Sequence, residues 1–484
     1  MTAAFDPLPF LAGQIRLLSP TRARIEGDDE TVAALDPLLS YLAPGYRYDP
    51  RFKRGIWDGQ ERLLAADLTF PAGLAPEVGA AAGVEVVGWP DAGRLARLPA
   101  PLTLSKHSDI KLREYQQTAV EAALAAQRGL LVMPTASGKT FVIAELLRRL
   151  GRTALVIVPT KELLNQTAAR LREYLGIEDV QQFGGGSHDF GFVTVATFQA
   201  LYRARDLGIA DELAAYEVVV ADEAHHVSAT TFSAVLEMCS GAAYRYGFTA
   251  TPDTGKTTDM VVRGMTGPII YEMSGEEGVA RGVLTPPTVW IMRLQDEPRL
   301  EYFDTQEQKT LPLPGSQWHK IHKEGIVRNA PRNTRFATVA AAVAQEWGPT
   351  LVVVRETEHG GLLLDQPVWG DTRVAYVDGS QSTAVRASAL ARLGAGDLQC
   401  LIATGILDEG VDVPTLSAVV LADGGRADYK VIQRIGRGRR IGGREQLLVL
   451  DSHDRAHPIL TYHARKRQAL YAREGWPVEW LAPI

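Results

Sequence analysis

Cysteine is almost absent from this chain. Among 484 residues only Cys239 and Cys400 occur, so neither a disulfide framework nor a cysteine-based zinc site can form. The ten histidines are scattered without the spacing of metal ligands. These absences favour a reducing compartment.

Long apolar runs are also missing. No run reaches the ~18 residues that a membrane span needs. The N-terminus lacks a basic region followed by an apolar stretch, which would mark a secretory signal. We therefore expect a cytoplasmic protein with no membrane partner.

The chain has no surplus of basic residues. Its 51 Lys and Arg against 57 Asp and Glu give a net charge of −6. Overall charge therefore does not support nucleic-acid binding, which usually shows as a basic excess. Any such binding must use local basic patches on an acidic body, which fits a protein that has to release its partner. The hydrophobic fraction of 46% is ordinary and allows more than one core.

The order of apolar and amphipathic runs predicts an α/β protein. Strand-like runs alternate with helical runs in two successive series, which implies two parallel-sheet lobes covered on both faces. The first series has strands at Gly129–Met133, Thr153–Val158, Phe192–Ala196 and Glu217–Val220. The second has strands at Thr350–Val354, Arg373–Val377, Gln399–Ala403 and Leu416–Leu421.

Four regions are expected from this pattern. Residues 1–105 form a small N-terminal α+β domain, 106–283 the first lobe, 284–455 the second lobe, and 456–484 a helical tail. The polar stretch Asp296–Pro331 is interpreted as a long loop or insertion. In the tail, Arg465, Lys466 and Arg467 are interpreted as a solvated charged face of a helix.

A small-residue turn follows the first strand of the first lobe and opens a helix. Its residues are Pro134, Thr135, Ala136, Ser137, Gly138, Lys139 and Thr140. A P-loop needs this context, because backbone N–H groups and the helix N-terminus can hold phosphate oxygens there. Lys139 would reach the β- and γ-phosphates of ATP, and Thr140 would hold Mg²⁺. Met133 stands where the general pattern has its first glycine.

Two carboxylates follow a buried strand of the same lobe. Asp222 and Glu223 end the apolar run Val218–Ala221. Neighbouring residues at a strand end point in different directions, so the two can divide their tasks. Asp222 would bind Mg²⁺, and Glu223 would orient and deprotonate the attacking water.

These motifs, in this order, resemble the superfamily 2 helicases with a DEAH-type box. The matching strings include Leu112–Gln116, Val158–Thr160, Thr197–Leu201, Asp222–His225, Thr249–Pro252, Thr404–Pro414 and Gln433–Arg440. Glu358–Gly360 and the stretch Tyr48–Gly59 are similar to the phage UvsW-type recombination and repair helicases, which are related to the XPB-like branch. The resemblance implies two tandem RecA-like lobes and remodelling of branched DNA.

The resemblance also implies roles for further residues. Gln116 would read adenine, with Arg113 nearby. From the second lobe, Gln433, Arg437 and Arg440 would face the nucleotide as catalytic residues, and Gly410 and Asp412 would help to form the closed interface around it. Thr249 and Thr251 would link the state of ATP to closure of the lobes.

The N-terminal region contains a dense mixture of basic and aromatic residues. Arg51, Lys53, Arg54 and Trp57 lie within seven positions, with other aromatic residues just before them. Cations can neutralise phosphates and aromatic rings can stack on bases. We expect these four residues to bind DNA; a small β core with a solvated basic face is the alternative.

The sequence thus predicts an ATP- and Mg²⁺-dependent DNA helicase or translocase that acts on duplex or branched DNA in recombination, repair or replication. We expect a monomer near the nucleoid or in a phage-infected cell, with recombination or replication proteins as possible partners. An RNA helicase and the motor subunit of a restriction system are alternatives with the same core. A non-catalytic scaffold is a third, which the complete set of motif residues disfavours.

Overall fold

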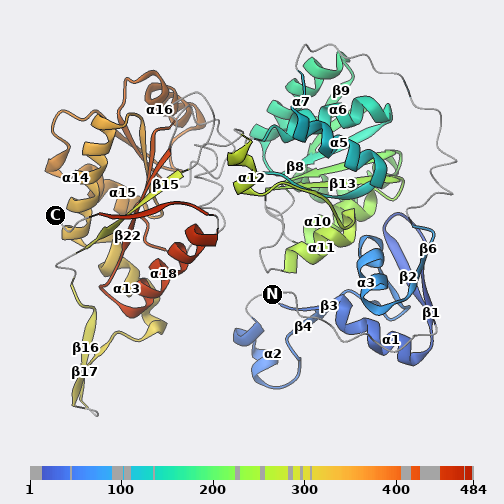
Figure 1. Cartoon of the computed structure of the whole chain (residues 1–484), viewed down its shortest axis with the longest axis horizontal. Coiled ribbons are helices and arrows are strands. Elements are labelled where there is room, and N and C mark those ends of the chain that lie inside the picture. Colours follow the sequence, from blue (N-terminus) through green and yellow to red (C-terminus); the bar gives the residue numbers. More distant parts are fainter. Residues whose placement is uncertain are drawn as a thin grey trace. The chain divides into compact units, whose positions relative to one another are not determined.

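The chain divides into two compact units in the computed structural model (Figure 1). The structure describes residues 13–43, 46–89, 102, 111–134, 137–223, 229–250, 257–281, 287–294, 298–305, 308–404, 416–425, 447–473 and 475–481. The first unit holds an N-terminal domain and the first lobe, and the second unit holds the second lobe. No helix within these ranges is both long and apolar enough to cross a membrane.

The N-terminal domain is built on a four-stranded sheet of order β5-β2-β1-β6. Its strands are β1 (Gly13–Leu17), β2 (Arg22–Gly27), β5 (Thr69–Pro71) and β6 (Glu85–Val87), with helices α1 (Asp29–Leu35) and α3 (Ala75–Ala82). Ile15, Ile25, Leu35 and Phe70 are fully buried between sheet and helices. β3 (Ser40–Leu42) and β4 (Gln60–Arg62) form a second, two-stranded sheet, and the short helix α2 (Pro50–Lys53) lies between them in the chain.

The first lobe contains an eight-stranded sheet of order β10-β9-β11-β8-β12-β13-β7-β14. All neighbouring strands are parallel except β9 and β10. The strands are β7 (Arg128–Val132), β8 (Ala154–Val158), β9 (Val180–Gly184), β10 (Ser187–His188), β11 (Val193–Thr197), β12 (Val218–Asp222), β13 (Tyr244–Thr249) and β14 (Ile269–Glu272). Every residue of β7, β8, β11 and β12 is buried, as expected for strands covered on both faces.

Helices cover both faces of this sheet. They are α5 (Glu114–Ala126), α6 (Lys139–Leu150), α7 (Lys161–Leu175), α8 (Phe198–Ala204), α9 (Ala210–Ala214), α10 (Ala229–Met238) and α11 (Thr257–Thr266). One apolar cluster joins α8, α10 and α11 to the sheet. Figure 1 shows α5, α6 and α7 on the opposite side.

The N-terminal domain packs against α10 and α11 of the first lobe. Arg22 Nη2 lies 2.7 Å from Glu237 Oε1, and Arg263 pairs with Glu77. The fully buried Arg128 donates hydrogen bonds to the carbonyl of Pro20, at 2.8 Å, and to that of Thr266, at 3.0 Å. Because guanidinium donors satisfy carbonyls from both domains, the two domains form one unit.

The second lobe has a seven-stranded, fully parallel sheet of order β19-β20-β18-β21-β22-β15-β23. Its strands are β15 (Pro287–Arg293), β18 (Thr350–Val354), β19 (Val374–Val377), β20 (Cys400–Thr404), β21 (Ala418–Leu421), β22 (Leu447–His453) and β23 (Val478–Leu481). Along β18, Leu351 and Val353 face one apolar cluster, while Val352 and Val354 face another. This alternation places a buried layer on each face of the sheet.

Four helices of the second lobe contribute to those layers. They are α12 (Gly275–Ala280), α13 (Trp318–His322), a π-helix (Lys323–Val327), α14 (Ala330–Glu346), α15 (Thr357–Leu364), α16 (Thr383–Ala395) and α18 (Pro458–Arg473). α14 and α15 supply the cluster on one face, and α16 and α18 the cluster on the other. The expected fold class, α/β with two tandem RecA-like lobes and a small N-terminal domain, is confirmed.

The structure corrects two expectations from the sequence. Of the two interpretations of Asp296–Pro331, the long loop is wrong and an insertion remains, because the described part contains the hairpin of β16 (Glu301–Asp304) and β17 (Lys309–Pro312), then α13 and the π-helix. Arg467 is not on a solvated face: it is 1% exposed and lies 2.8 Å from Asp451. Local composition signals polarity in both places, but tertiary partners give these residues order and burial.

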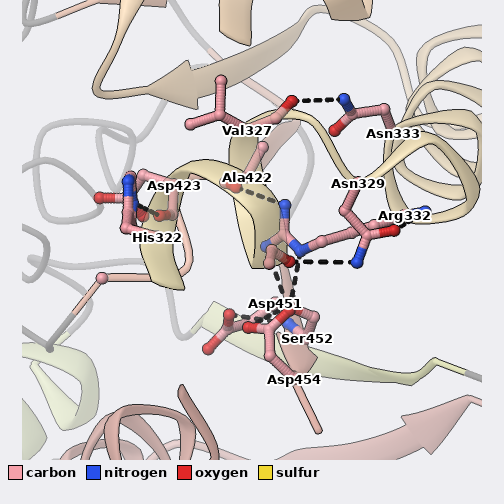
Figure 2. Close-up of polar contacts among 12 residues, drawn as sticks. His322, Val327, Asn329, Arg332, Asn333, Ala422, Asp423, Asp451, Ser452 and Asp454 are labelled. Atoms are coloured by element: carbon pink, nitrogen blue, oxygen red, sulfur yellow. Dashed lines mark hydrogen bonds and ion pairs between the residues drawn. The ribbon is translucent and has the colours of Figure 1, made fainter. Parts of the chain in front are cut away.

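A buried ionic network occupies the core of the second lobe near the end of β22 (Figure 2). Arg332 on α14 lies 2.7 Å from Asp454, and neither side chain is exposed. Arg467 on α18 bonds to Asp451 and also reaches Asp454 at 3.4 Å. Burial by itself would raise the pKa of Asp454, but the two guanidinium groups hold it below its ordinary value.

Arg467→Met is expected to destabilise the protein strongly. It leaves Asp451 without its guanidinium partner in the core, and removal of one member of a buried ion pair costs about 3–5 kcal/mol. The adjacent Lys466 is exposed, so Lys466→Met is the matched control and should change stability little. Thermal unfolding of both variants tests this; equal melting temperatures would show that the network is not stabilising.

Candidate ATP and nucleic-acid sites

The predicted phosphate loop connects β7 to α6 in the first lobe. Lys139 is the first residue of α6, and Gly138 precedes it in the left-handed conformation with φ +79°. A Cβ atom on Gly138 would lie 2.4 Å from Gln116 Nε2, and the positive φ of Gly138 would strain any residue with a side chain. Pro134, Ser137 and Thr140 take their expected places around this turn, whereas Thr135 and Ala136 lie outside the described residues.

The two carboxylates lie at the end of β12, close to this turn. Lys139 Nζ is 2.5 Å from Glu223 Oε1, and both side chains are largely buried. Glu223 has φ +50°, an unusual conformation for a residue with a side chain. Its backbone N–H donates a hydrogen bond of 3.0 Å to Asp222 Oδ1. This ion pair therefore joins two residues that are 84 positions apart in the sequence.

Asp222 is an unusual carboxyl group. Burial raises its pKa to about 6, although the Lys139 ammonium opposes the shift and the Glu223 carboxylate adds to it. A buried carboxylate needs a positive partner to stay charged. Carboxylate and hydroxyl oxygens are also the ligands that Mg²⁺ prefers, so Asp222 and Thr140 fit the expected metal.

Two more expected residues adjoin the phosphate loop. The Arg113 N–H donates 2.9 Å to Gln116 Oε1, which caps the start of α5. The nitrogen of the Gln116 side-chain amide, Nε2, faces Gly138. The Met133 N–H donates 2.8 Å to the carbonyl of Thr249, the last residue of β13. Thr251 lies outside the described residues.

A cavity of about 800 Å³ opens at the same edge of the sheet, beyond β12. Its walls include the segments that follow β8, β9 and β11. The Phe183 and Phe190 rings stack at 4.9 Å, and His188 meets Phe183 edge-on at 5.2 Å. The exposed cations Lys161 and Arg203 line it without an ion pair to any described residue. Sequence reasoning quoted the flanking motifs but did not identify the cavity, because its walls come from segments after β8, β9 and β11 that are separated in the chain.

The N-terminal basic and aromatic residues lie around α2. Arg51 pairs with Asp49 at 3.0 Å and lies over the Trp57 ring at 4.7 Å. Lys53 and Arg54 are exposed and pair with no acidic residue in the described part of the chain. The Trp57 indole N–H donates 2.8 Å to the carbonyl of Gln60. Lys53 and Arg54 are therefore better placed than Arg51 to meet a phosphate.

The second-lobe site residues Gly410, Asp412, Gln433, Arg437 and Arg440 all lie outside the described residues. The structure does describe the chain up to Gly425, and three buried groups hold the carbonyls of that segment. Arg332 donates a hydrogen bond of 2.7 Å to the carbonyl of Ala422, and His322 lies 3.1 Å from the carbonyl of Asp423 (Figure 2). Arg467 donates a hydrogen bond of 2.5 Å to the carbonyl of Gly425. Sequence reasoning missed His322 and Arg332 and placed Arg467 on a solvated face, because none of the three belongs to a motif.

Three family descriptions match separate parts of the chain. Residues 14–84 match "DNA helicase UvsW, N-terminal", residues 109–254 match "Type III restriction enzyme, res subunit", and residues 335–442 match "Helicase conserved C-terminal domain". These spans correspond to the N-terminal domain, the first lobe and the second lobe.

Curated relatives match over most of their length. The ATP-dependent DNA helicase uvsW of Enterobacteria phage T4 is 27% identical over 451 residues, covering 87% of this chain and 86% of that protein. The DNA 3'-5' translocase XPB2 of Sulfurisphaera tokodaii is 26% identical over 377 residues, covering 73% of this chain and 83% of that protein. A structure of S. cerevisiae Dbp5 bound to RNA and ADP BeF3 has a TM-score of 0.53 at 18% identity, covering 77% of this chain and 90% of that one, and supports the fold alone.

The geometry and the matches agree. A phosphate loop, two strand-end carboxylates and a second parallel-sheet lobe occur in the order of the matched helicase domains. The chain is a superfamily 2 helicase with a UvsW-like N-terminal domain.

Proposed function

We propose that this protein is an ATP-dependent DNA helicase that remodels branched DNA. The observation that carries the proposal is the ion pair of Lys139 with Glu223 beside Asp222, in a chain that aligns with the phage helicase through its N-terminal domain. The names of the relatives support DNA as the substrate and ATP as the fuel.

Hydrolysis would use the first-lobe residues in separate roles. Lys139 would exchange Glu223 for the β- and γ-phosphates when ATP binds, which leaves the Glu223 carboxylate available to accept a proton from water. Asp222 and Thr140 would hold Mg²⁺, which neutralises charge on the phosphates when bound. Gln116, with Arg113 at the start of α5, would contact adenine beside the phosphate loop.

The second lobe would complete the site when the lobes close. Arg437 and Arg440, three positions apart, can point to one side of a helical turn, and their charged planar heads suit the charge that develops on the γ-phosphoryl group. Gln433, Gly410 and Asp412 would line the closed interface around the nucleotide. These five residues are assigned from the motifs alone.

DNA would meet the first unit at two places. The cavity beyond β12 offers aromatic walls for bases and two cations, Lys161 and Arg203, for phosphates. The segment around α2 offers Lys53, Arg54 and the Trp57 ring, with Arg51 already paired to Asp49. Both places combine cations that can bind phosphates with aromatic rings that can stack on bases.

The substrate can be tested directly with the purified chain. ATP hydrolysis is measured with single-stranded, duplex, forked and four-way DNA and with RNA, at one salt concentration. We expect branched DNA to stimulate hydrolysis most and RNA least. Stronger stimulation by RNA would support the alternative of an RNA helicase, and stimulation by unbranched duplex alone would favour the motor of a restriction system.

Glu223→Gln should stop hydrolysis and preserve ATP binding. The substitution removes the base and keeps the shape of the side chain, and loss of a general base costs roughly 10²–10⁴ in rate. Lys139→Ala is the contrast, because removal of the phosphate contact should weaken ATP binding as well. Steady-state hydrolysis and equilibrium nucleotide binding distinguish them. Near-normal turnover of Glu223→Gln would contradict its role as the base.

Replacement of Lys53 and Arg54 by Gln should reduce the salt dependence of DNA binding. Two lost phosphate contacts lower the slope of log affinity against log salt by about 1.8, at about 0.9 per contact. The matched control replaces Arg16 and Arg24, paired opposite each other on β1 and β2, by Gln. Both variants lose two positive charges from the same domain. An equal slope change in both would mean that total charge, not this segment, sets DNA affinity.

A further inference from the structure

An aromatic ring lies beside the phosphate loop, on the first turn of α6. Phe141 is the second residue after Lys139, and its side chain is only half-buried. The residues that follow it, Val142 and Ile143, are fully buried. Phe141 is therefore on the partly exposed side of an amphipathic helix, where a ring is not needed to fill the core.

The ring and the side-chain amide of Gln116 meet at Gly138. A Cβ atom on Gly138 would lie 2.4 Å from Gln116 Nε2 and 3.5 Å from Phe141 Cδ2. The Gln116 carbonyl oxygen already accepts a hydrogen bond from the Arg113 N–H, whereas its nitrogen carries two N–H donors. Those donors suit the ring nitrogens along the edge of a purine, and the neighbouring phenyl ring suits its face.

Two side chains of α7 hold the Phe141 ring in place. The guanidinium carbon of Arg170 lies over the ring, 5.9 Å from its centroid. The ring of Tyr174 is tilted by 49° to it, with the two centroids 6.4 Å apart. A side chain that is already fixed loses little conformational entropy when it stacks on a ligand.

A cavity of about 400 Å³ adjoins these residues and is lined by α5, α6 and α7. Leu112 and Gln117 line it from either side of the pair Arg113 and Gln116 in the chain. Tyr174, whose ring neighbours that of Phe141, is also part of its wall. Small-molecule pockets have volumes of about 300–1,000 Å³, so the cavity is large enough for one nucleoside.

The lining of this cavity suits an uncharged ring. Its two carboxylates are already paired, Glu121 with Arg149 and Glu145 with Arg148. Among the described lining residues, only Lys111 is a charge without such a partner, and it is exposed. Leucine, valine and tyrosine side chains supply much of the remaining wall. A flat base fits these surroundings better than a second phosphate group does.

We propose that Phe141 stacks on the adenine of ATP and directs the base toward this cavity. The inference rests on the proposed ATP-dependent function and deepens it. Phosphates bound at Lys139 would place the base of the same nucleotide within reach of Gln116 and Phe141. Gln116 then recognises the edge of the adenine, and Phe141 its face. A purine offers a larger face than a pyrimidine, so the ring also favours ATP over pyrimidine triphosphates.

The test measures equilibrium binding of ATP and of inorganic tripolyphosphate to the full chain. Tripolyphosphate supplies the phosphates without the base. Phe141→Leu keeps an apolar side chain and removes the stacking face. We expect this variant to bind ATP roughly tenfold more weakly, within the range for loss of one base–aromatic stack, and to bind tripolyphosphate as before. Phe141→Trp should bind ATP as the original chain does, because an indole ring also stacks.

Phe141→Trp also provides a spectroscopic readout. ATP should quench the emission of this variant more than that of the original chain, which has eight tryptophans, and tripolyphosphate should not. Tyr202→Leu is the matched control, because Tyr202 is a half-buried ring on α8 with Arg205 over it at 4.3 Å. This control should bind both ligands like the original chain.

The outcomes distinguish the stacking role from the proposed function. Normal ATP binding by Phe141→Leu would overturn the stacking role. Equal weakening of both ligands would overturn it too, since Phe141 would then only support the helix that carries the phosphate loop. If the original chain binds ATP no more tightly than tripolyphosphate, the base makes no contact and the stacking role also fails. If the original chain binds ATP without hydrolysing it, the proposed function fails, while the binding data still decide the role of Phe141.

Discussion

The arrangement of the first lobe depends on one constraint: its parallel strands all end at the same edge of the sheet. β7, β13 and β12 are neighbours, so the phosphate loop, Thr249 and Asp222 emerge side by side. The ion pair of Lys139 with Glu223 lies at that edge, and each of the two buried charges compensates the other. The next strands, β8, β11 and β9, end in the walls of the cavity. One half of the sheet edge thus carries the phosphate loop and the two carboxylates, and the other half carries the cavity.

Elsewhere, buried guanidinium groups join elements of the fold by donating hydrogen bonds to backbone carbonyls. Arg245 is fully buried and donates 2.8 Å to each of the carbonyls of Leu236, Cys239 and Met265, at the ends of α10 and α11. Helix ends leave carbonyls without partners, and one guanidinium with five N–H donors can satisfy several at once. Arg128 does this between the N-terminal domain and the first lobe. A charge is expensive to bury, so such residues tolerate little substitution.

The same device links distant features of the second lobe. Arg332 and Arg467 share Asp454, and between them they hold the chain just before the segment of Arg437 and Arg440. The loop after β22 carries Asp454 on one side and the base of the β16–β17 hairpin on the other. These contacts join α14, α18 and the base of the hairpin through the loop that follows β22.

The sequence by itself determined the fold class, the order of the strands in the chain and the family, because periodicity and ordered motifs are local properties. The strand at Thr350–Val354 agrees to the residue with its predicted bounds. Lys139 was selected from its turn between a strand and a helix, and Asp222 and Glu223 from their position at the end of an apolar run. Only the tertiary structure decided that Lys139 bonds to Glu223 and that Arg467 is buried. It also showed that a stretch expected to be a loop contains a hairpin whose base is held by hydrogen bonds. These are contacts between residues far apart in sequence or between alternative partners, and composition does not specify which partner a charged side chain will find.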